Sequence, residues 1–397
     1  MTTTDTKLEA DVRAEARTWF EANWDPDLQL GAWWERLAAS GWGYPTWPVE
    51  WYGKGVPSTL ARVVLEERRR VGAAAPPAGI AQNLAGPTIV AHGTEEQKRR
   101  YLPDIVEGKL VWCQLFSEPG AGSDLAGLRT RAVRDGDEWI VNGQKIWTSG
   151  AHLATHGILL ARTNPGQPKH AGITYFIFDM LQPGVEVRPI REMTGNAVFN
   201  EVFFTDARIP NAQVLGEVDG GWNVAMTTLS HERSMLGAGS MSMGGGMTGL
   251  SISRPTLDAR AGDFGDKPRG DASAGPFSGG AAGMFSTLAG MYGKTQDAMT
   301  RQDVARIYSM LEIARFTSLR AQAAVERGGR PGPEVSTGKL AASILVQAMR
   351  DASLAILGPY GMLFGDDAPM GGRVHGMALS TPLFSIGGGT DQVQRNI

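Results

Sequence analysis

Residues 117–124, SEPGAGSD, form the first segment of the sequence whose composition suggests chemistry. Two glycines flank an alanine there, so the backbone can approach a ligand without an intervening side chain. Backbone N–H groups next to the hydroxyl of Ser123 are donors that suit a phosphate or pyrophosphate. Taken alone, however, a glycine-rich segment is more often an ordinary turn.

A second segment, WIVNGQKIWTS at residues 139–149, has an Asn-Gly pair with apolar residues on both sides. This pattern predicts a β-hairpin whose turn lies at Asn142-Gly143. Such a hairpin would deliver Trp147, Thr148 and Ser149 to one end of a small sheet. A tryptophan at a strand end more often belongs to the core than to a ligand site, so this segment alone identifies no function.

The third feature is a carboxylate on an apolar helical stripe. Glu232 lies at helical spacing from Ala225, Leu229 and Leu236. Burying a carboxylate costs free energy, so a buried one is expected to have a partner or a catalytic role. Burial also raises its pKa, which makes it a stronger base. The alternatives are a salt bridge with a residue later in the chain and a slightly rotated helix that exposes Glu232.

Together, at this spacing, SEPGAGSD and NGQKIWTSG resemble the flavin-binding segments of the acyl-CoA dehydrogenase family. Residues 84–103 and 389–396, LAGPTIVAHGTEEQKRRYLP and GTDQVQRN, also look like that family. The resemblance covers nearly the whole chain except a stretch near residues 238–300. It implies FAD as the cofactor, an acyl-CoA substrate and an electron-transfer flavoprotein as the electron acceptor.

The resemblance also implies a reaction in which two hydrogens leave the carbons next to an acyl-CoA thioester. One leaves as a proton from the α carbon, and the other leaves as a hydride from the β carbon to flavin N5. A carboxylate must therefore stand by the α carbon as the base. The thioester oxygen must be hydrogen-bonded, and the flavin must lie on the other side of the substrate.

Site residues follow from the resemblance, position by position. Those that would contact the isoalloxazine are Phe116, Ser117 and Ser149, with Trp147 packed against the ring. Those that would meet the rest of the cofactor are Gly122 and Ser123 at the pyrophosphate, and Thr390 and Gln392 from the C-terminal motif. Those that would contact the substrate are Ser123 and Arg233, the latter at the CoA moiety unless it is a surface arginine.

The catalytic base departs from the commonest family pattern. Many members carry a glutamate two residues before the threonine of an EGT-x-Q motif, and that position here is Gly388. Gly388 has no side chain to act as a base but keeps its N–H, which in the family helps to polarise the thioester carbonyl. A minority of the family places the base on the first helix after the β-domain, where this chain has Glu232.

Other departures affect the half of the FAD site that the family completes across subunits. An Arg-x-x-Phe-Gly run that grips the neighbouring subunit's FAD is missing from its usual place in the sequence. A family glutamine that crosses the interface aligns with Ala355, and a nearby glycine aligns with Pro359. The family also continues beyond the position of Ile397.

Three regions must position these residues. Residues 1–110 have helical periodicity, and Thr94 with Gln97 predicts a capping box. Residues 111–220 alternate with period two, which predicts strands at 110–116, 130–133, 138–141, 158–161, 173–178, 185–189 and 201–204. Residues 221–397 return to helical spacing, with a glycine-rich insertion at about 238–300 that we expect to be flexible, without a packed helix.

The expected fold is therefore α+β and multidomain, with an N-terminal helical domain, a central antiparallel β-barrel-like domain and a C-terminal four-helix bundle. The resemblance implies the same order. It also implies that FAD lies between the β-domain and the C-terminal helices, partly against a neighbouring subunit, in a homo- or hetero-tetramer.

Composition excludes several classes of function. A net charge of −3 over 397 residues gives no basic field, so nucleic acid is not an expected partner. The single cysteine, Cys113, fits a reducing compartment, and the N-terminus has no apolar signal-peptide core. We expect no membrane span. A cytoplasmic enzyme is therefore predicted.

The main interpretation is a flavin-dependent acyl-CoA dehydrogenase with Glu232 as the base. The segment QLFSEPGAGSDLA looks most like that of actinobacterial members of the family. Some of those members oxidise branched, long-chain or steroid-side-chain CoA esters, and some are heteromers. One alternative is a non-catalytic, dehydrogenase-like subunit of a heteromeric enzyme, which the missing interface residues favour. The other is a related flavin oxidase or monooxygenase, which the oxygen reactivity of the reduced flavin would reveal.

Overall fold

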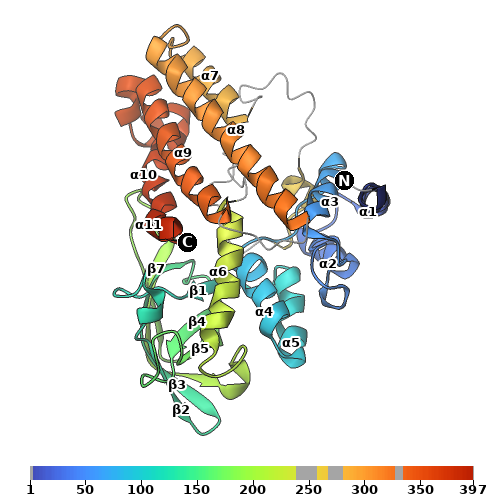
Figure 1. Ribbon diagram of the computed structural model, residues 1–397, viewed down its shortest axis with the longest axis vertical. Helices are drawn as coiled ribbons and strands as arrows, with labels where there is room; N and C mark the ends of the chain where they lie inside the picture. Colours follow the sequence, from blue (N-terminus) through green and yellow to red (C-terminus); the bar gives the residue numbers. More distant parts are fainter. Residues whose placement is uncertain (1–2, 238–256, 267–279, 327–333, 397) are drawn as a thin grey trace. The chain divides into compact units, whose positions relative to one another are not determined.

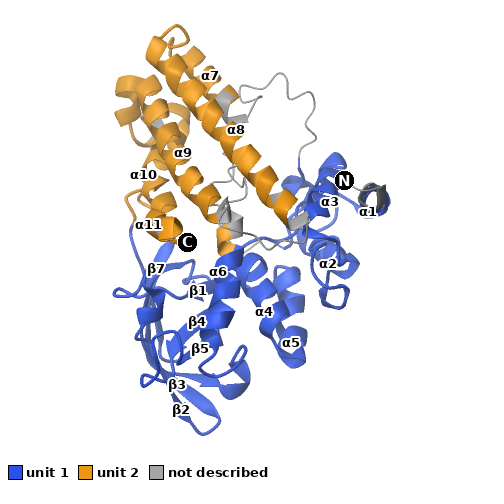
Figure 2. Cartoon of the chain, viewed as in Figure 1, with its two compact units in different colours: residues 1–191, 197–231, 247–268 blue, residues 192–196, 232–246, 269–397 orange. Residues whose placement is uncertain are grey.

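The computed structural model describes residues 3–237, 257–266, 280–326 and 334–396 (Figure 1). The chain divides into two compact units (Figure 2). Unit 1 takes in residues 1–191, 197–231 and 247–268, and unit 2 takes in residues 192–196, 232–246 and 269–397.

Unit 1 begins with helices, as the sequence predicts. They are α1 (Thr3–Asn23), α2 (Leu30–Ser40), α3 (Ala61–Arg70), α4 (Gly86–His92) and α5 (Glu95–Val106). The capping box of α5 is confirmed, because Gln97 N–H donates to Thr94 Oγ1 at 3.2 Å and Thr94 N–H donates to Gln97 Oε1 at 3.0 Å. A core of buried aromatic and aliphatic side chains, including Phe20, Trp33 and Val63, joins α1, α2 and α3.

A seven-stranded sheet follows. Its strands are β1 (Trp112–Leu115), β2 (Arg131–Asp135), β3 (Glu138–Ser149), β4 (His156–Arg162), β5 (Ile173–Asp179), β6 (Val185–Pro189) and β7 (Phe199–Pro210). The strand order is β1-β4-β2-β3-β7-β6, and β5 pairs with β4. The predicted antiparallel β-domain is confirmed for most pairs, although β1–β4 and β2–β4 pair in parallel.

The predicted hairpin turn at Asn142-Gly143 is wrong. β3 runs through this pair as one strand, and the turn to β2 lies earlier, between the partners Asp135 and Glu138. Asn142 instead bonds across to β7, where its Nδ2 lies 2.9 Å from Asp206 Oδ1 and its Oδ1 accepts from Asp206 N–H at 3.0 Å. The Asn-Gly pair is therefore a strand irregularity that β7 holds in place.

Gly143 is required at that irregularity for two reasons. Its φ of +152° is rarely adopted by residues with a side chain, and a Cβ there would lie 2.7 Å from the Cα of Thr130. The close approach brings β3 against Thr130, just before β2 begins. This contact matters below, because Thr130 also binds a buried carboxylate of the candidate site.

Helix α6 (Gly221–Gly237) follows the sheet, and its last residues are assigned to unit 2. Within unit 1, Figure 1 shows α6 between the sheet and α4. Thr228 confirms this placement, because its hydroxyl bonds to Thr88 of α4 at 2.9 Å and to Tyr175 of β5 at 3.0 Å.

Unit 2 is helical. Its elements are α7 (Gly280–Met291), α8 (Ala298–Glu326), α9 (Glu334–Leu357), α10 (Arg373–Ile386) and α11 (Asp391–Asn396). The four helices α7–α10 share a core in which Phe285, Ile307, Met349 and Val374 are buried. The predicted C-terminal four-helix domain is confirmed.

The prediction of no packed helix between 238 and 300 is wrong for α7. Met284 and Phe285 lie four and three residues before Leu288, and together they give this glycine-rich helix an apolar face. Residues 257–266 of the same stretch are also described, and Ala261 is buried against the N-terminal helices. Residues 238–256 and 267–279 lie outside the described residues, so the predicted flexibility stays a prediction.

One described helix, Ser336–Met362, is long and apolar enough to cross a membrane, which the sequence analysis did not expect. Its mean hydropathy is 1.5, and 44% of the window is buried inside the structure. Leu345, Met349 and Ile356 on this helix belong to the α7–α10 core. Its apolar composition is therefore of the kind that a core helix has.

Candidate functional site

The predicted site residues fall into two groups, one in each unit. Those in unit 1 lie in the loop after β1 and at the end of β3, and they are Phe116, Ser117, Gly122, Ser123, Trp147 and Ser149. Those in unit 2 lie on α6 and around the start of α11, and they are Glu232, Arg233, Gly388, Thr390 and Gln392.

The loop after β1 is a tight turn that faces open space. Glu118 and Ala121 exchange two backbone hydrogen bonds of 3.0 Å each, which fold the chain back at Pro119-Gly120. A Cβ at Gly120 or Gly122 would meet no atom within 4 Å, and Ser123 is exposed. The backbone of this turn is therefore open to a ligand, as the sequence predicts.

The end of β3 presents Trp147 in an unusual conformation. The β3–β7 register shifts between Lys145 and Thr148, and within this bulge Trp147 has a left-handed φ of +59°. Its ring is 58% exposed and meets Phe199 edge-on at 6.0 Å. A bulky residue with positive φ is strained, and such strain gathers at ligand sites. The bulge thus presents an aromatic surface at the sheet end.

The two residues after Trp147 differ in their surroundings. The Thr148 hydroxyl is buried and finds no hydrogen-bond partner in the part of the chain that the structure describes. Ser149 is partly buried and pairs with Phe199 in the β3–β7 ladder. A buried hydroxyl without a partner is unusual, and a bound molecule is one way to satisfy it.

The side chain of Phe116 belongs to the core, and its predicted contact with the isoalloxazine stays a prediction. Its ring is 4% exposed and packs edge-on against Tyr175 at 5.8 Å, inside the core. Any contact between Phe116 and a ligand therefore falls to its backbone. The next residue, Ser117, is partly buried, and its carbonyl accepts from Ile146 N–H of β3 at 3.0 Å.

A buried ion pair underlies both segments. Lys145 Nζ lies 2.8 Å from Glu118 Oε1 and 2.9 Å from the carbonyl oxygen of Phe116. Burial lowers the pKa of Lys145 to about 8. Burial opposes the ionisation of Glu118, but Lys145 and the Thr130 and Arg129 donors hold its pKa below the usual value.

Sequence reasoning missed this pair. Glu118 lies inside the first motif and Lys145 inside the second, 27 residues apart along the chain. The sequence feature that could have revealed the pair is the alternation of β3, whose buried side includes Lys145 as well as Trp139 and Val141. A lysine at an inward position of a strand requires a partner, and the neighbouring motif holds a carboxylate.

A second group of contacts fixes α6. The hydroxyls of Thr88, Tyr175 and Thr228 are all buried and joined by the two bonds given above. One residue earlier on α6, Thr227 bonds to His92 of α4 at 2.8 Å. These contacts, which the sequence analysis also missed, anchor the helix whose next turn carries Glu232.

On α6 the predicted apolar stripe is partly observed. Ala225 is fully buried and Leu229 is partly buried, whereas Glu232 and Arg233 are each partly buried. The side chain of Leu236 lies outside the described residues. The catalytic and substrate-binding roles of Glu232 and Arg233 stay predictions.

Around α11, two consecutive glycines form the turn that precedes the helix. Gly388 has φ +66° and Gly389 has φ +88°, and the side-chain amide of Gln394 donates to their carbonyls at 2.9 and 3.4 Å. Thr390 Oγ1 caps α11 by accepting from Val393 N–H at 3.2 Å. Gln392 is exposed, so its side chain is open to a ligand.

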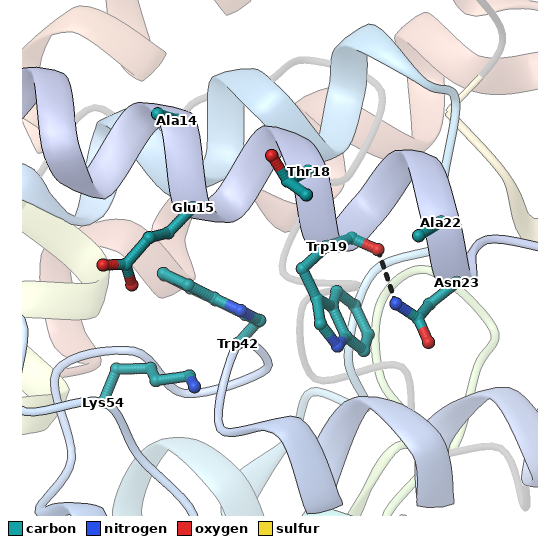
Figure 3. Close-up of a pocket in the computed structure, with 8 residues that line it drawn as sticks. All are labelled: Ala14, Glu15, Thr18, Trp19, Ala22, Asn23, Trp42 and Lys54. Carbon is teal, nitrogen blue, oxygen red and sulfur yellow. Dashed lines mark hydrogen bonds between the residues drawn. The ribbon is translucent and has the colours of Figure 1, made fainter.

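A groove of about 500 Å³ lies elsewhere in unit 1, on α1. Figure 3 shows its lining, with Trp19 and Asn23 on α1 and with Trp42 beside Lys54. The ammonium of Lys54 lies 5.0 Å from the centre of the Trp42 ring. No predicted site residue lines this groove, so it is a separate feature of the surface.

Comparisons with known proteins cover most of the chain. Family models match three parts in order: "Acyl-CoA dehydrogenase, N-terminal domain" at residues 2–109, "middle domain" at 113–207 and "C-terminal domain" at 293–397. The chain is 31% identical over 370 residues to acyl-CoA dehydrogenase FadE26 of Mycobacterium tuberculosis, which covers 91% of this chain and 84% of that protein.

Two other relatives from Mycobacterium tuberculosis match over shorter lengths. Acyl-CoA dehydrogenase FadE34 is 48% identical over 203 residues, and acyl-CoA dehydrogenase IpdE1 is 49% identical over 205 residues. Each alignment covers 51% of this chain, with 28% of FadE34 and 53% of IpdE1. The matched part of this chain therefore spans about half or less of these relatives.

Solved structures are similar over nearly the full chain. The Tcur3481-Tcur3483 steroid ACAD is 29% identical with a TM-score of 0.72, covering 98% of this chain and 94% of that one. The ChsE4-ChsE5 complex from Mycobacterium tuberculosis is 28% identical with a TM-score of 0.69, covering 100% and 96%.

Proposed function

The chain belongs to the acyl-CoA dehydrogenase family, and from that premise we propose that it catalyses α,β-dehydrogenation of an acyl-CoA thioester with FAD. The observation that carries the proposal is the paired edge of unit 1. There the open turn at Gly120 and Gly122 is hydrogen-bonded to the strand that presents Trp147 and Ser149.

The residues at this edge fit a flavin. The turn has room for a phosphate beside Gly122 and Ser123, Trp147 offers an exposed ring, and Thr148 has a buried hydroxyl without a partner among the described residues. When bound, FAD supplies the ring system that takes up the hydride. Ser117 and Ser149 would orient that ring, and Gly122 with Ser123 would hold the pyrophosphate.

Glu232 is proposed as the base that takes the proton from the α carbon. It lies one turn beyond Thr228, whose bonds to Thr88 and Tyr175 fix α6. A carboxylate on an anchored helix can be held in one position against a substrate, which is what general-base catalysis needs. Gly388 would contribute its N–H to the thioester oxygen, and Arg233 would contact the CoA moiety.

We further propose a bulky acyl group, such as a branched, long-chain or steroid-derived one. Gly388 has no side chain, which leaves room where many family members have a glutamate. The similar Tcur3481-Tcur3483 protein is described as a steroid ACAD. An electron-transfer flavoprotein is the proposed electron acceptor, by analogy with the family.

The proposed assembly is a homo- or hetero-tetramer. On α8 the apolar side chains of Tyr308, Ile313 and Phe316 are more than half exposed, which favours a helical interface. One similar solved structure is a complex of two different chains, ChsE4 and ChsE5. Because Ala355 and Pro359 replace residues that the family uses at its interface, a second, different chain is the favoured partner.

The absorbance spectrum of the purified protein tests the proposal. We expect a bound flavin that is bleached anaerobically by at least one member of a panel of acyl-CoA esters of increasing bulk. Bleaching by short linear esters in preference to bulky ones would contradict the substrate assignment. A protein that binds no FAD, alone or with a candidate partner chain, would contradict the function itself.

The second candidate is a non-catalytic subunit of a heteromeric dehydrogenase. The observation that favours it is the loss of the interface residues at Ala355 and Pro359. It predicts that Glu232→Gln leaves the activity of the reconstituted heteromer unchanged. The retained SEPGAGSD turn and the carboxylate of Glu232 on α6 favour the catalytic assignment.

A further inference from the structure

We propose that Lys145 and Glu118 are positioning residues that fasten the loop after β1 to the end of β3. The inference rests on the proposed function only for the identity of the ligand as FAD. Its structural part, that one buried pair keeps two ligand-facing segments in register, can be tested on the protein without a ligand.

The first contacts join β3 to the loop after β1. Lys145 on β3 reaches Glu118 and the Phe116 carbonyl of the loop, at 2.8 and 2.9 Å. Ile146 N–H adds a bond of 3.0 Å to the Ser117 carbonyl. Three consecutive loop residues, 116–118, are thus bonded to two consecutive strand residues, 145 and 146. These bonds do not use the side-chain hydroxyls of Ser117 and Ser149.

Glu118 extends the fastening to the start of β2. Its carboxylate accepts from Arg129 N–H at 2.6 Å and from Thr130 N–H at 2.8 Å. Gly143 brings β3 against the same Thr130, as described above. The carboxylate therefore fixes where the turn leaves the sheet and where the chain re-enters it.

The pair is buried, which distinguishes it from an exposed ion pair with little effect on the structure. The Lys145 side chain is fully buried, and that of Glu118 is 7% exposed. Apolar side chains of similar volume would fill such a space at a lower desolvation cost. They would not, however, bind the Phe116 carbonyl or the N–H groups of Arg129 and Thr130, which the polar pair does.

Among the described residues, two cationic side chains interact with Glu118. Glu118 faces Lys145 directly, and the guanidinium of Arg162, which bonds to the Ala126 carbonyl at 2.6 Å, also interacts with Glu118. Because the pKa of Lys145 is lowered to about 8 by burial, its charge is lost as the pH rises through that value. Glu118 then lacks its counter-charge, and the loop is held less firmly.

The sign of the pH effect on folding is the opposite. An ammonium whose pKa is lower in the folded chain than in the unfolded chain costs free energy while it is charged. That cost is relieved as the pH rises from about 8 to the unfolded value of 10.5. Above pH 8, therefore, FAD retention should fall while this group alone makes the fold more stable.

The experiment compares the wild-type protein with the double variant Lys145→Met/Glu118→Gln, which removes both charges at similar volume. Hydrogen exchange of the FAD-free protein should show faster exchange at the amides of Ala121 and Ile146, by roughly tenfold or more. FAD should bind at least about tenfold more weakly. A matched control is Arg188→Met/Glu186→Gln, which removes an exposed ion pair on β6 and should change neither quantity.

Unchanged exchange at Ala121 and Ile146 in the double variant, with FAD affinity equal to that of wild type, would overturn the proposal. If the double variant does not fold, the wild-type protein decides. Its FAD affinity should fall by up to about tenfold per pH unit above pH 8, and a flat profile from about pH 7 to 9 would overturn the proposal. If the wild type binds no FAD, the proposed function fails, and hydrogen exchange across the same pH range still tests the fastening.

Discussion

The two groups of predicted site residues, one in each unit, are built in different ways. In unit 1 the ends of β1 and β3 are fastened by a buried ion pair, and Trp147 is held in a strained conformation. In unit 2 the turn before α11 has left-handed φ angles at Gly388 and Gly389, and Gln394 bonds to both carbonyls. The group in unit 1 depends on specific side chains, whereas the turn in unit 2 depends on glycines, which have none.

This difference indicates which kind of ligand group each set of residues can bind. Side chains in unit 1 hold an aromatic ring and an open turn in place, which suits a large, flat ligand. The turn in unit 2 offers backbone N–H groups, which suit a single oxygen atom. In unit 1, substitutions should therefore destabilise the protein most where a buried charge loses its partner. In the unit 2 turn, they should do so where a Cβ is added.

The largest effect is expected for Lys145→Met. Deprotonation leaves a neutral amine that can still donate to Glu118 and to the Phe116 carbonyl, whereas methionine removes both hydrogen bonds together with the charge. The free energy of unfolding should therefore fall by about 3–5 kcal/mol. Denaturant unfolding followed by tryptophan fluorescence measures this. The control is Arg188→Met, which breaks an exposed pair and should cost about 0–1 kcal/mol. If the two variants lost the same free energy of unfolding, the buried pair would contribute no more to stability than an exposed pair.

A smaller effect is expected for Thr228→Val, which has nearly the same volume. The buried hydroxyls of Thr88 and Tyr175 lose their shared partner, so the free energy of unfolding should fall by about 1–3 kcal/mol. Thr227→Val is the matched control, because its partner His92 is only partly buried and can bond to water. If Thr227→Val costs more than Thr228→Val, the hydroxyl group is not what anchors α6.

The smallest stability effect concerns the turn of unit 2. Gly388→Ala places a side chain at φ +66° and should cost about 1–2 kcal/mol. The same strain applies to Gly388→Glu, which would restore the commoner position of the base. Gly376→Ala on α10, where a Cβ meets no atom within 4 Å, should instead stabilise the protein by about 0.5–1 kcal/mol. Thermal unfolding should show a lower melting temperature for Gly388→Ala and a higher one for Gly376→Ala.

Local sequence patterns predicted most elements because their causes are local. The capping box at Thr94 and Gln97 needs only four residues, and β6 occupies the predicted 185–189. The Asn142-Gly143 pair was misread as a turn because its conformation is set by Asp206 and Thr130, which lie far away along the chain. Helix α7 was missed because glycine content outweighed the short apolar face of Met284, Phe285 and Leu288 in the prediction.

The candidate site was predictable to the extent that the family resemblance named its residues. The motifs located Ser123 in a loop and Trp147 and Ser149 at a strand end, where the structure has them. They did not reveal that the Phe116 ring lies in the core. They also did not reveal that buried Lys145 bonds to the loop after β1, or that buried Thr228 bonds to α4 and β5. Those roles depend on partners from other strands and helices, which one sequence does not display.

The most direct test of the account is the rate of anaerobic flavin reduction by a good acyl-CoA substrate in wild-type protein and Glu232→Gln. The variant keeps the size of the side chain but removes the base, so reduction should slow by at least roughly a hundredfold, with FAD and acyl-CoA still bound. Ser230→Ala, on an exposed position of the same helix, is the control and should reduce at the wild-type rate. If Glu232→Gln also reduces at the wild-type rate, the base lies elsewhere and the mechanism proposed here is wrong.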